Sequence, residues 1–144
     1  MKLEIINKSN NPLPEYQTIG AAGMDLRAFL EKDEVLKPLE RSLISTGLSI
    51  ALPDGYEAQI RPRSGMAYKH GLSVLNTPGT IDTDYRGELK VLLVNLSNEE
   101  FIVKTGERIA QMVITKFEQP ELIEVKALST TDRNAGGFGS TGTN

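Results

Sequence analysis

The apolar residues of this chain fall in short runs, most of them rich in β-branched side chains and separated by Gly, Pro, Asn or Asp. Turn-forming sequences recur between the runs, as in Pro53-Asp-Gly and Thr105-Gly-Glu. Runs of this length and rhythm are typical of an all-β sandwich, jelly roll or barrel. The predicted strands cover residues 3–6, 24–29, 43–45, 48–52, 56–61, 73–75, 89–96, 101–104, 109–117 and 122–125.

One segment, Ser64–Gly71, predicts a short helix. Ser64 has the chemistry of an N-cap, two basic residues suit the last turn, and Gly71 can adopt the left-handed conformation that ends a helix. The preceding Arg61-Pro-Arg-Ser-Gly sequence would lie at the helix N-terminus, where free N–H groups favour an anion. The whole cluster indicates a phosphate site, whereas Ser64 taken singly indicates only a cap.

The segment Val91–Val94 is apolar on both faces of its predicted strand, unlike a strand in a sheet that is wet on one side. A second sheet or another copy of the chain must therefore cover the outer face. With 39% hydrophobic and only 6% aromatic residues, we expect an oligomer in which such strands face each other.

Composition narrows the function. The 144 residues suit one domain, and a net charge of −3 gives no global positive field for nucleic acid or an anionic membrane. The absence of Cys excludes disulfides and thiolate chemistry, and a single His disfavours a His-based zinc centre or a Ser-His-Asp triad. The charged N-terminus resembles no signal peptide and no apolar run approaches membrane-spanning length, so we expect a cytoplasmic protein with no membrane contact.

The stretch Gly79–Gly87 holds two carboxylates, a phenol and a guanidinium between two glycines. Apolar β-rich segments flank it, which predicts a hairpin whose crossing carries the polar groups. In extended backbone Asp82 and Asp84 would point the same way, although Asp, Thr and Gly are also ordinary turn residues. In the strand 109–117, Gln111 shares a face with Ile109 and Val113, so its amide is either bonded to backbone or aimed into a site.

The tail, residues 129–144, has little apolar content and reads as a flexible segment. Its glycine spacing matches a dinucleotide fingerprint, but the context of a strand before and a helix after is missing. The tail could remain a disordered terminus. Alternatively, Arg133, Phe138 and two hydroxyls could cover a nucleotide by ordering on binding.

Five segments together resemble the sequence motifs of the trimeric deoxyuridine triphosphate nucleotidohydrolase (dUTPase) family, in the same order and at compatible separations. The resemblance covers essentially the whole chain, and five co-linear motifs are far more specific than any one. The segments are Ala22–Leu26, Pro62–Gly65, Gly79–Gly87, Gly106–Met112 and Arg133–Gly142.

The resemblance implies a jelly-roll homotrimer with active sites at subunit interfaces and an exchanged C-terminal tail. Residues 1–128 would form the β domain and residues 129–144 its glycine-rich lid. The implied reaction is Mg²⁺-assisted hydrolysis of dUTP to dUMP and pyrophosphate by a water that attacks the α-phosphorus. It would limit uracil incorporation into DNA and supply dUMP for thymidylate synthesis.

The resemblance also implies a role for each matching residue. Asp82 would activate the water, Gln111 would serve the α-phosphate region, and Asp25 would act through water on the magnesium shell. Tyr85 would exclude a 2′-hydroxyl beneath the deoxyribose. The implied substrate contacts are Arg63, Ser64, Gly65, Asn76, Gly79, Thr80, Ile81, Tyr85, Lys90, Arg133, Phe138, Gly139, Ser140 and Thr141.

One departure from the family pattern lies in the tail, where Asn134 stands at a position often held by Gly. Asn tolerates left-handed backbone, so the departure concerns lid closure and not the chemistry. Two other functions compete: a dCTP deaminase of the same fold, and a non-catalytic nucleotide-binding regulatory module. The deaminase reaction usually employs a glutamate where this hairpin offers Asp82, and the presence of Asp82, Tyr85 and Arg63 argues against a regulatory module.

Overall fold

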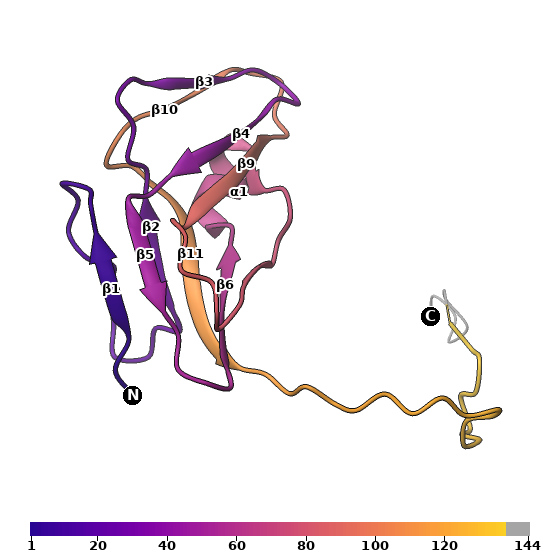
Figure 1. Cartoon of the computed structure of the whole chain (residues 1–144). Coiled ribbons are helices and arrows are strands. Elements are labelled where there is room, and N and C mark those ends of the chain that lie inside the picture. Colours follow the sequence, from indigo (N-terminus) through magenta and orange to yellow (C-terminus); the bar gives the residue numbers. More distant parts are fainter. Residues whose placement is uncertain (138–144) are drawn as a thin grey trace.

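The computed structural model describes residues 1–137, and these residues form the predicted mostly β architecture with one short helix (Figure 1). The helix, α1, spans Ser64–His70. The strands are β1 (Glu4–Asn7), β2 (Gly23–Arg27), β3 (Glu34–Leu36), β4 (Arg41–Ser45), β5 (Leu48–Ala51), β6 (Tyr56–Arg61), β7 (Leu72–Val74), β8 (Gly79–Ile81), β9 (Lys90–Asn95), β10 (Phe101–Val103) and β11 (Arg108–Lys116).

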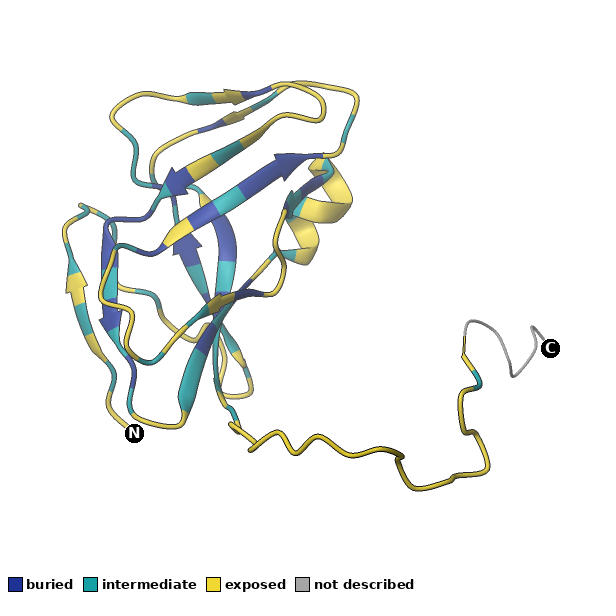
Figure 2. Ribbon diagram, turned by 45° about the vertical axis from the view of Figure 1, so that its right-hand side comes forward, coloured by how far each residue is buried: buried dark blue, intermediate teal, exposed yellow. Residues whose placement is uncertain are grey.

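Two larger sheets supply the core of a jelly-roll-like sandwich. One has the strand order β2-β11-β6-β8 and the other the order β4-β9-β7, while the pairs β1-β5 and β3-β10 complete the body. Buried and exposed positions alternate along most strands, as Figure 2 shows. Inward side chains of both sheets join in one hydrophobic cluster that includes Leu26, Ile60, Met112, Ile44, Val74 and Leu93.

The alternation determines which polar side chains face away from the core. Met24 and Leu26 of β2 are buried, so Asp25 between them projects from the opposite face. A register irregularity between Arg108 and Ala110 of β11 buries Ile109 beside Ala110. The prediction that Gln111 shares a face with Ile109 is therefore wrong: Gln111 pairs with Asp25 and lies on the outer face.

Apart from shifts of one or two residues at strand ends, the predicted and observed strands differ at three places. The segment 34–36 was not predicted, and it forms a strand by pairing with β10. Residues 79–81 were expected in the hairpin crossing, but they form β8, which pairs with β6. The predicted strand 122–125 is wrong for the isolated chain, because these residues lie exposed outside the body and have no neighbouring strand within residues 1–137.

The doubly apolar segment of β9 is covered mostly within the chain. Val91, Leu93 and Val94 are buried, and Leu92 is half-buried. One face of the strand, with Val91 and Leu93, joins the hydrophobic core, whereas Leu92 on the other face is only half-buried. Within residues 1–137 no helix has the length and apolar content that a membrane crossing requires.

Candidate active site

A cluster of charged side chains surrounds Asp25 on the outer face of β2 and β11. Arg63 donates from Nε to Asp25 Oδ1 at 2.8 Å, and Arg108 lies 3.3 Å from Oδ2 of the same carboxylate. Arg63 also donates to the carbonyl oxygen of Arg108 at 3.0 Å. Two guanidinium groups against one carboxylate leave a net positive charge, which suits a phosphate. We call Asp25, Arg63, Arg108 and Gln111 the arginine cluster.

Gln111 is connected to this cluster through Pro62, the residue that precedes Arg63. Its Nε2 donates to the carbonyl oxygen of Pro62 at 2.9 Å, which settles where the amide finds its partner. A Cβ at Gly23, on the paired strand, would lie 2.5 Å from Gln111 Oε1. Because Gly23 has no side chain, the amide of Gln111 can occupy this space.

Arg108 is a site candidate that sequence reasoning did not single out. It lies inside the motif Gly106–Met112, but a single basic residue at a strand end resembles a solvated surface charge. Its proximity to Asp25 depends on the pairing of β11 with β2, which no local pattern reveals.

The start of α1 differs in detail from the prediction. Arg63, not Ser64, is the N-cap residue, and it makes no side-chain capping hydrogen bond. Ser64 and Gly65 are the first helical residues, so their backbone N–H groups have no acceptor within the helix. These N–H groups directly follow Arg63 of the arginine cluster. Gly71 ends the helix in the left-handed conformation, with φ of 63°, as predicted.

A second region, a small cavity beneath the loop after β7, gathers five of the predicted contact residues. Its volume is about 160 Å³, below the roughly 300 Å³ at which pockets for whole ligands usually begin, so it suits one part of a ligand. Gly79 is buried there, and a Cβ on it would lie 3.1 Å from Asn76 Nδ2. The cavity is lined by Asn76, Gly79, Thr80, Ile81 and Lys90, with Leu43, Ile60, Val74 and Leu92.

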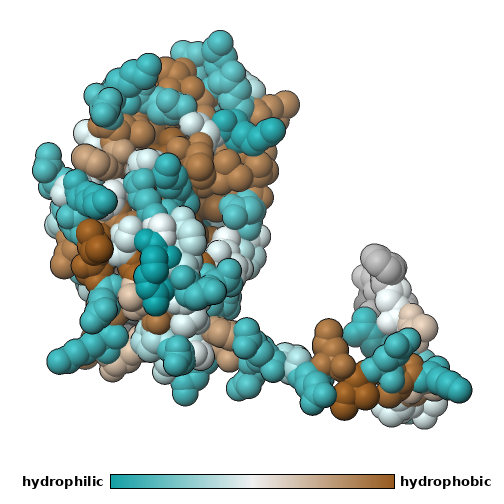
Figure 3. Space-filling model, viewed as in Figure 1, coloured by the Kyte–Doolittle hydropathy of each residue, from teal (hydrophilic) through white to brown (hydrophobic). Residues whose placement is uncertain are grey.

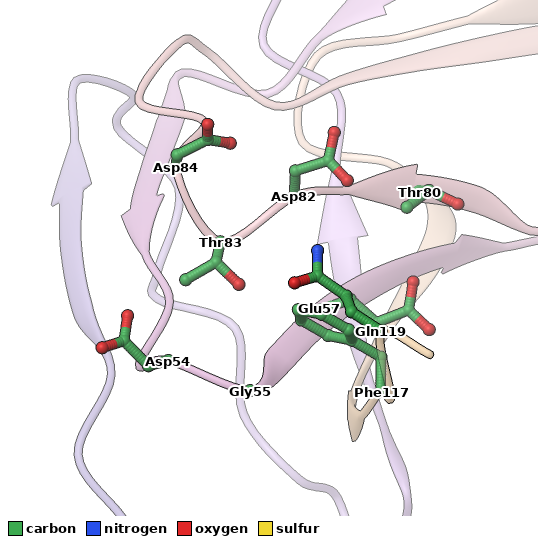
Figure 4. A pocket seen from close by; sticks show the side chains of 9 residues that line it. All are labelled: Asp54, Gly55, Glu57, Thr80, Asp82, Thr83, Asp84, Phe117 and Gln119. Atoms are coloured by element: carbon green, nitrogen blue, oxygen red, sulfur yellow. The ribbon is translucent and has the colours of Figure 1, made fainter. Parts of the chain in front are cut away.

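Asp82 lines a wider pocket that begins at the end of β8 (Figure 4). Asp82 and Asp84 both line this pocket, and Figure 4 shows their carboxylates on the same side of the turn, opposite Thr83, as the sequence predicted. Thr80 lines both the wide pocket and the small cavity, which places Asp82 next to the residues that line the cavity. Asp82 itself is exposed and open to water.

Tyr85 closes the turn that carries Asp82. Its backbone N–H donates to the carbonyl oxygen of Asp82, and its hydroxyl donates to the carbonyl oxygen of Glu88 at 3.1 Å. The carboxylate of Glu88 lies 3.7 Å from Lys90 Nζ, and Lys90 lines the small cavity. The phenol and the cavity are thus linked through Glu88 and Lys90.

One chain does not bring all the predicted site residues together. Asp25, Arg108 and Gln111 lie on β2 and β11, whereas the small cavity lies along β8, at the other edge of the same four-stranded sheet. Arg63 follows β6, which lies between these edges. Three strand spacings separate β2 from β8, which corresponds to about 14 Å.

The tail leaves the body after β11 and extends away from it (Figure 1). Arg133 is exposed and donates to the carbonyl oxygen of Gly136 at 2.8 Å, within the tail itself. Asn134 adopts a positive φ of 42°, the backbone region that Asn tolerates better than most residues. The predicted contacts Phe138, Gly139, Ser140 and Thr141 lie outside the described residues.

Known proteins resemble this chain in sequence, and a solved structure resembles it in fold. The proteins named deoxyuridine 5′-triphosphate nucleotidohydrolase from Finegoldia magna and Cytophaga hutchinsonii are 63% and 64% identical, over 99% and 97% of this chain and 99% and 91% of their own lengths. The solved structure of the Staphylococcus bacteriophage 80alpha dUTPase with dUPNHPP covers 98% of each chain, with a TM-score of 0.88 and 28% identity.

The family model described as dUTPase matches residues 9–142, which includes the strands that carry the arginine cluster, the small cavity and Asp82. The match extends beyond the β body into the tail. Together with relatives more than 60% identical over nearly the full length, it shows that this chain belongs to the dUTPase family.

Proposed function

We propose that the protein hydrolyses dUTP to dUMP and pyrophosphate. The observation that carries the proposal is the small cavity that shares Thr80 with the open pocket of Asp82. A ring held in the cavity would leave the attached phosphates in reach of a carboxylate and of water. The names of the relatives that are more than 60% identical support the same reaction.

In the proposed reaction Asp82 orients a water molecule and accepts one of its protons. The water oxygen bonds to the α-phosphorus while the bond from that phosphorus to the bridging oxygen of the β-phosphate breaks, and pyrophosphate leaves. Such a reaction needs positioning and charge neutralisation more than covalent chemistry by the protein. Asp82 is open to solvent, so a water molecule can reach it. Arg63 and Gln111 would hold the phosphate oxygens.

A magnesium ion would fit this proposal if it bound through water and the substrate phosphates. Among residues 1–137 no group of three or more His, Cys, Asp and Glu side chains is arranged to hold a metal. Mg²⁺ often keeps several waters and binds through substrate phosphates with one or two carboxylates. Asp25 has lone pairs left beyond its two arginine contacts, so it could hold the waters of such an ion. The ion would neutralise charge on the triphosphate.

Base and sugar selection would come from the region of β8. The cavity residues Asn76, Thr80 and Ile81 would recognise the uracil edge, and its small volume would exclude a 5-methyl group. Tyr85 would lie beneath the deoxyribose and leave no room for a 2′-hydroxyl. By selecting dUTP the protein would limit uracil in DNA and supply dUMP for thymidylate synthesis.

We also propose that the site is complete only in a homotrimer. The estimated separation of about 14 Å between β2, which carries Asp25, and β8, which lines the cavity, supports assembly from different copies. Residues 1–128 would form the body of each copy, and residues 129–144 a lid in which Arg133 meets the γ-phosphate and Phe138 stacks on the base. The extended course of the tail in Figure 1 supports its reach to another copy.

The products separate this function from a deaminase of the same fold. Incubation with dUTP should release pyrophosphate and dUMP in equal amounts, and incubation with dCTP should release no ammonia. Ammonia from dCTP without pyrophosphate from dUTP would replace the proposed function with deamination. Binding of dUTP without either product would identify a regulatory module.

A further inference from the structure

The aromatic ring of Tyr85 lies directly against Gly87. A Cβ built on Gly87 would lie 2.5 Å from Cζ and 3.0 Å from Cε2 of Tyr85, and closest of all to its hydroxyl oxygen. Non-bonded heavy atoms do not lie this close together, so either the new side chain or the ring would have to shift. Any side chain at position 87 would therefore compete with the ring for the same space.

The backbone beside Gly87 is not free to move aside. The carboxylate of Glu88 accepts the backbone N–H of Gly47 at 2.9 Å. Leu89 donates its N–H to the carbonyl oxygen of Leu48 at 2.7 Å and accepts the hydroxyl of buried Thr46 at 2.6 Å. These bonds fasten the segment after Gly87 to the turn between β4 and β5.

The ring, in contrast, can move at little cost. Tyr85 is 44% exposed, and its described hydroxyl contact is the single bond to the carbonyl oxygen of Glu88. An exposed hydroxyl that leaves such a bond can bond to water instead. A methyl group at position 87 should therefore displace the ring and leave the fold intact.

We propose that Gly87 is a positioning residue for Tyr85, and that the missing side chain at position 87 sets how closely the phenol approaches the deoxyribose. The proposal rests on the proposed function, in which Tyr85 excludes a 2′-hydroxyl. It makes the selection between deoxyribose and ribose depend on two residues: the ring that fills the space and the glycine that lets the ring lie there.

The test compares kcat/KM for dUTP and for UTP in the full-length wild-type protein and in Gly87→Ala. The ratio of the two values should fall by about tenfold or more, in the range that one mispositioned group can cost. Thermal unfolding should shift by less than about 4 °C, the scale of a lost exposed hydrogen bond. Gly20→Ala is the matched control, because a Cβ there meets nothing within 4 Å; its ratio should equal that of the wild type.

Two further variants separate the possible failures. Tyr85→Ala should itself lose the discrimination, and adding Gly87→Ala to it should change the ratio no further, because Gly87 acts only through the ring. If Tyr85→Ala keeps the discrimination, the proposed role of Tyr85 fails. If Tyr85→Ala loses it but Gly87→Ala retains it, or if Gly87→Ala does not fold, the positioning role of Gly87 is overturned and the proposed function stands.

Discussion

Three polar side chains implied in substrate contact pack against a glycine. Tyr85 lies on Gly87, the amide of Gln111 lies beside Gly23, and that of Asn76 lies beside buried Gly79. In each pair the glycine supplies space for a neighbouring functional group. The sequence shows the glycines but not which side chain lies against each of them. This is clearest for Gly23 and Gln111, which are far apart along the chain.

The Asp82→Asn variant tests the proposed base. Asparagine keeps the size of the side chain but accepts a proton poorly, so pyrophosphate release from dUTP should fall by about 10²- to 10⁴-fold while dUTP still binds. Single-turnover kinetics and equilibrium binding measure the two effects. Asp84→Asn is the matched control from the same pocket, and it should retain most activity. Unchanged turnover in Asp82→Asn would remove Asp82 from this role.

The Gly23→Ala variant tests whether the position of Gln111 matters. The new methyl group would force the amide away from the carbonyl oxygen of Pro62, and kcat should fall on the order of tenfold to a hundredfold, as displaced site groups commonly cost. Steady-state kinetics measures the loss. If Gly23→Ala has the kcat of wild-type protein, the bonded position of Gln111 has no part in the reaction.

At the scale of elements, the sequence predicts strands well where apolar and turn residues alternate clearly. The predicted strand 56–61 has the observed bounds of β6. In contrast, β3 lies among charged residues and has only Val35 and Leu36 as apolar members. It forms because β10 supplies the hydrogen-bonding partner, and the pairing of segments far apart in sequence is not visible in either segment.

The segment 122–125 shows the same dependence in the opposite direction. Its composition predicts a strand, but Leu122, Ile123 and Val125 are exposed in the isolated chain, outside the body. A strand needs a partner and a covered face to be stable. The local sequence shows only that these residues favour a strand. Whether they form one depends on a neighbouring strand with which they can pair.

Asn95 joins β9 to two other segments and should be important for stability. It is fully buried, donates from Nδ2 to the carbonyl oxygens of Leu36 and Glu99 at 2.8 Å, and accepts from the backbone and hydroxyl of Ser97. Asn95→Leu should reduce the free energy of unfolding by about 2–4 kcal/mol, because several buried partners lose their bonds. Urea denaturation measures this change. Ser97→Ala removes fewer bonds and should cost about 1 kcal/mol; a smaller loss for Asn95→Leu than for Ser97→Ala would contradict this account.

At the scale of the whole molecule, the surface carries exposed apolar residues that the proposed trimer would cover. Figure 3 shows hydrophobic surface over the region that Figure 1 labels β4 and β9, and a further hydrophobic group on the extended tail. Leu43 of β4 is 56% exposed, and Leu75 after β7 is 48% exposed. Apolar surface of this kind would be covered in the proposed trimer. The sequence indicated an oligomer through β9, but β9 is mostly covered within the chain.

Deletion of the chain from Arg133 onward tests the lid. The hydrophobic core ends at Met112, with Ile114 packed against it, so the truncated protein should fold and keep its oligomeric state. Pyrophosphate release should drop by at least about tenfold, because contacts to the γ-phosphate and base would be lost. Analytical ultracentrifugation and activity measure the two effects. Full activity after truncation would leave the tail as the disordered terminus that its composition suggested.

The most direct measurement of the central claim is pyrophosphate release from a panel of deoxynucleoside and ribonucleoside triphosphates, with Mg²⁺ and with a chelator. The proposed site predicts rapid release from dUTP with Mg²⁺, much slower release from UTP, dTTP and dCTP, and a marked loss of rate when Mg²⁺ is removed. Equal rates across the panel, or no pyrophosphate from dUTP, would contradict the proposed function.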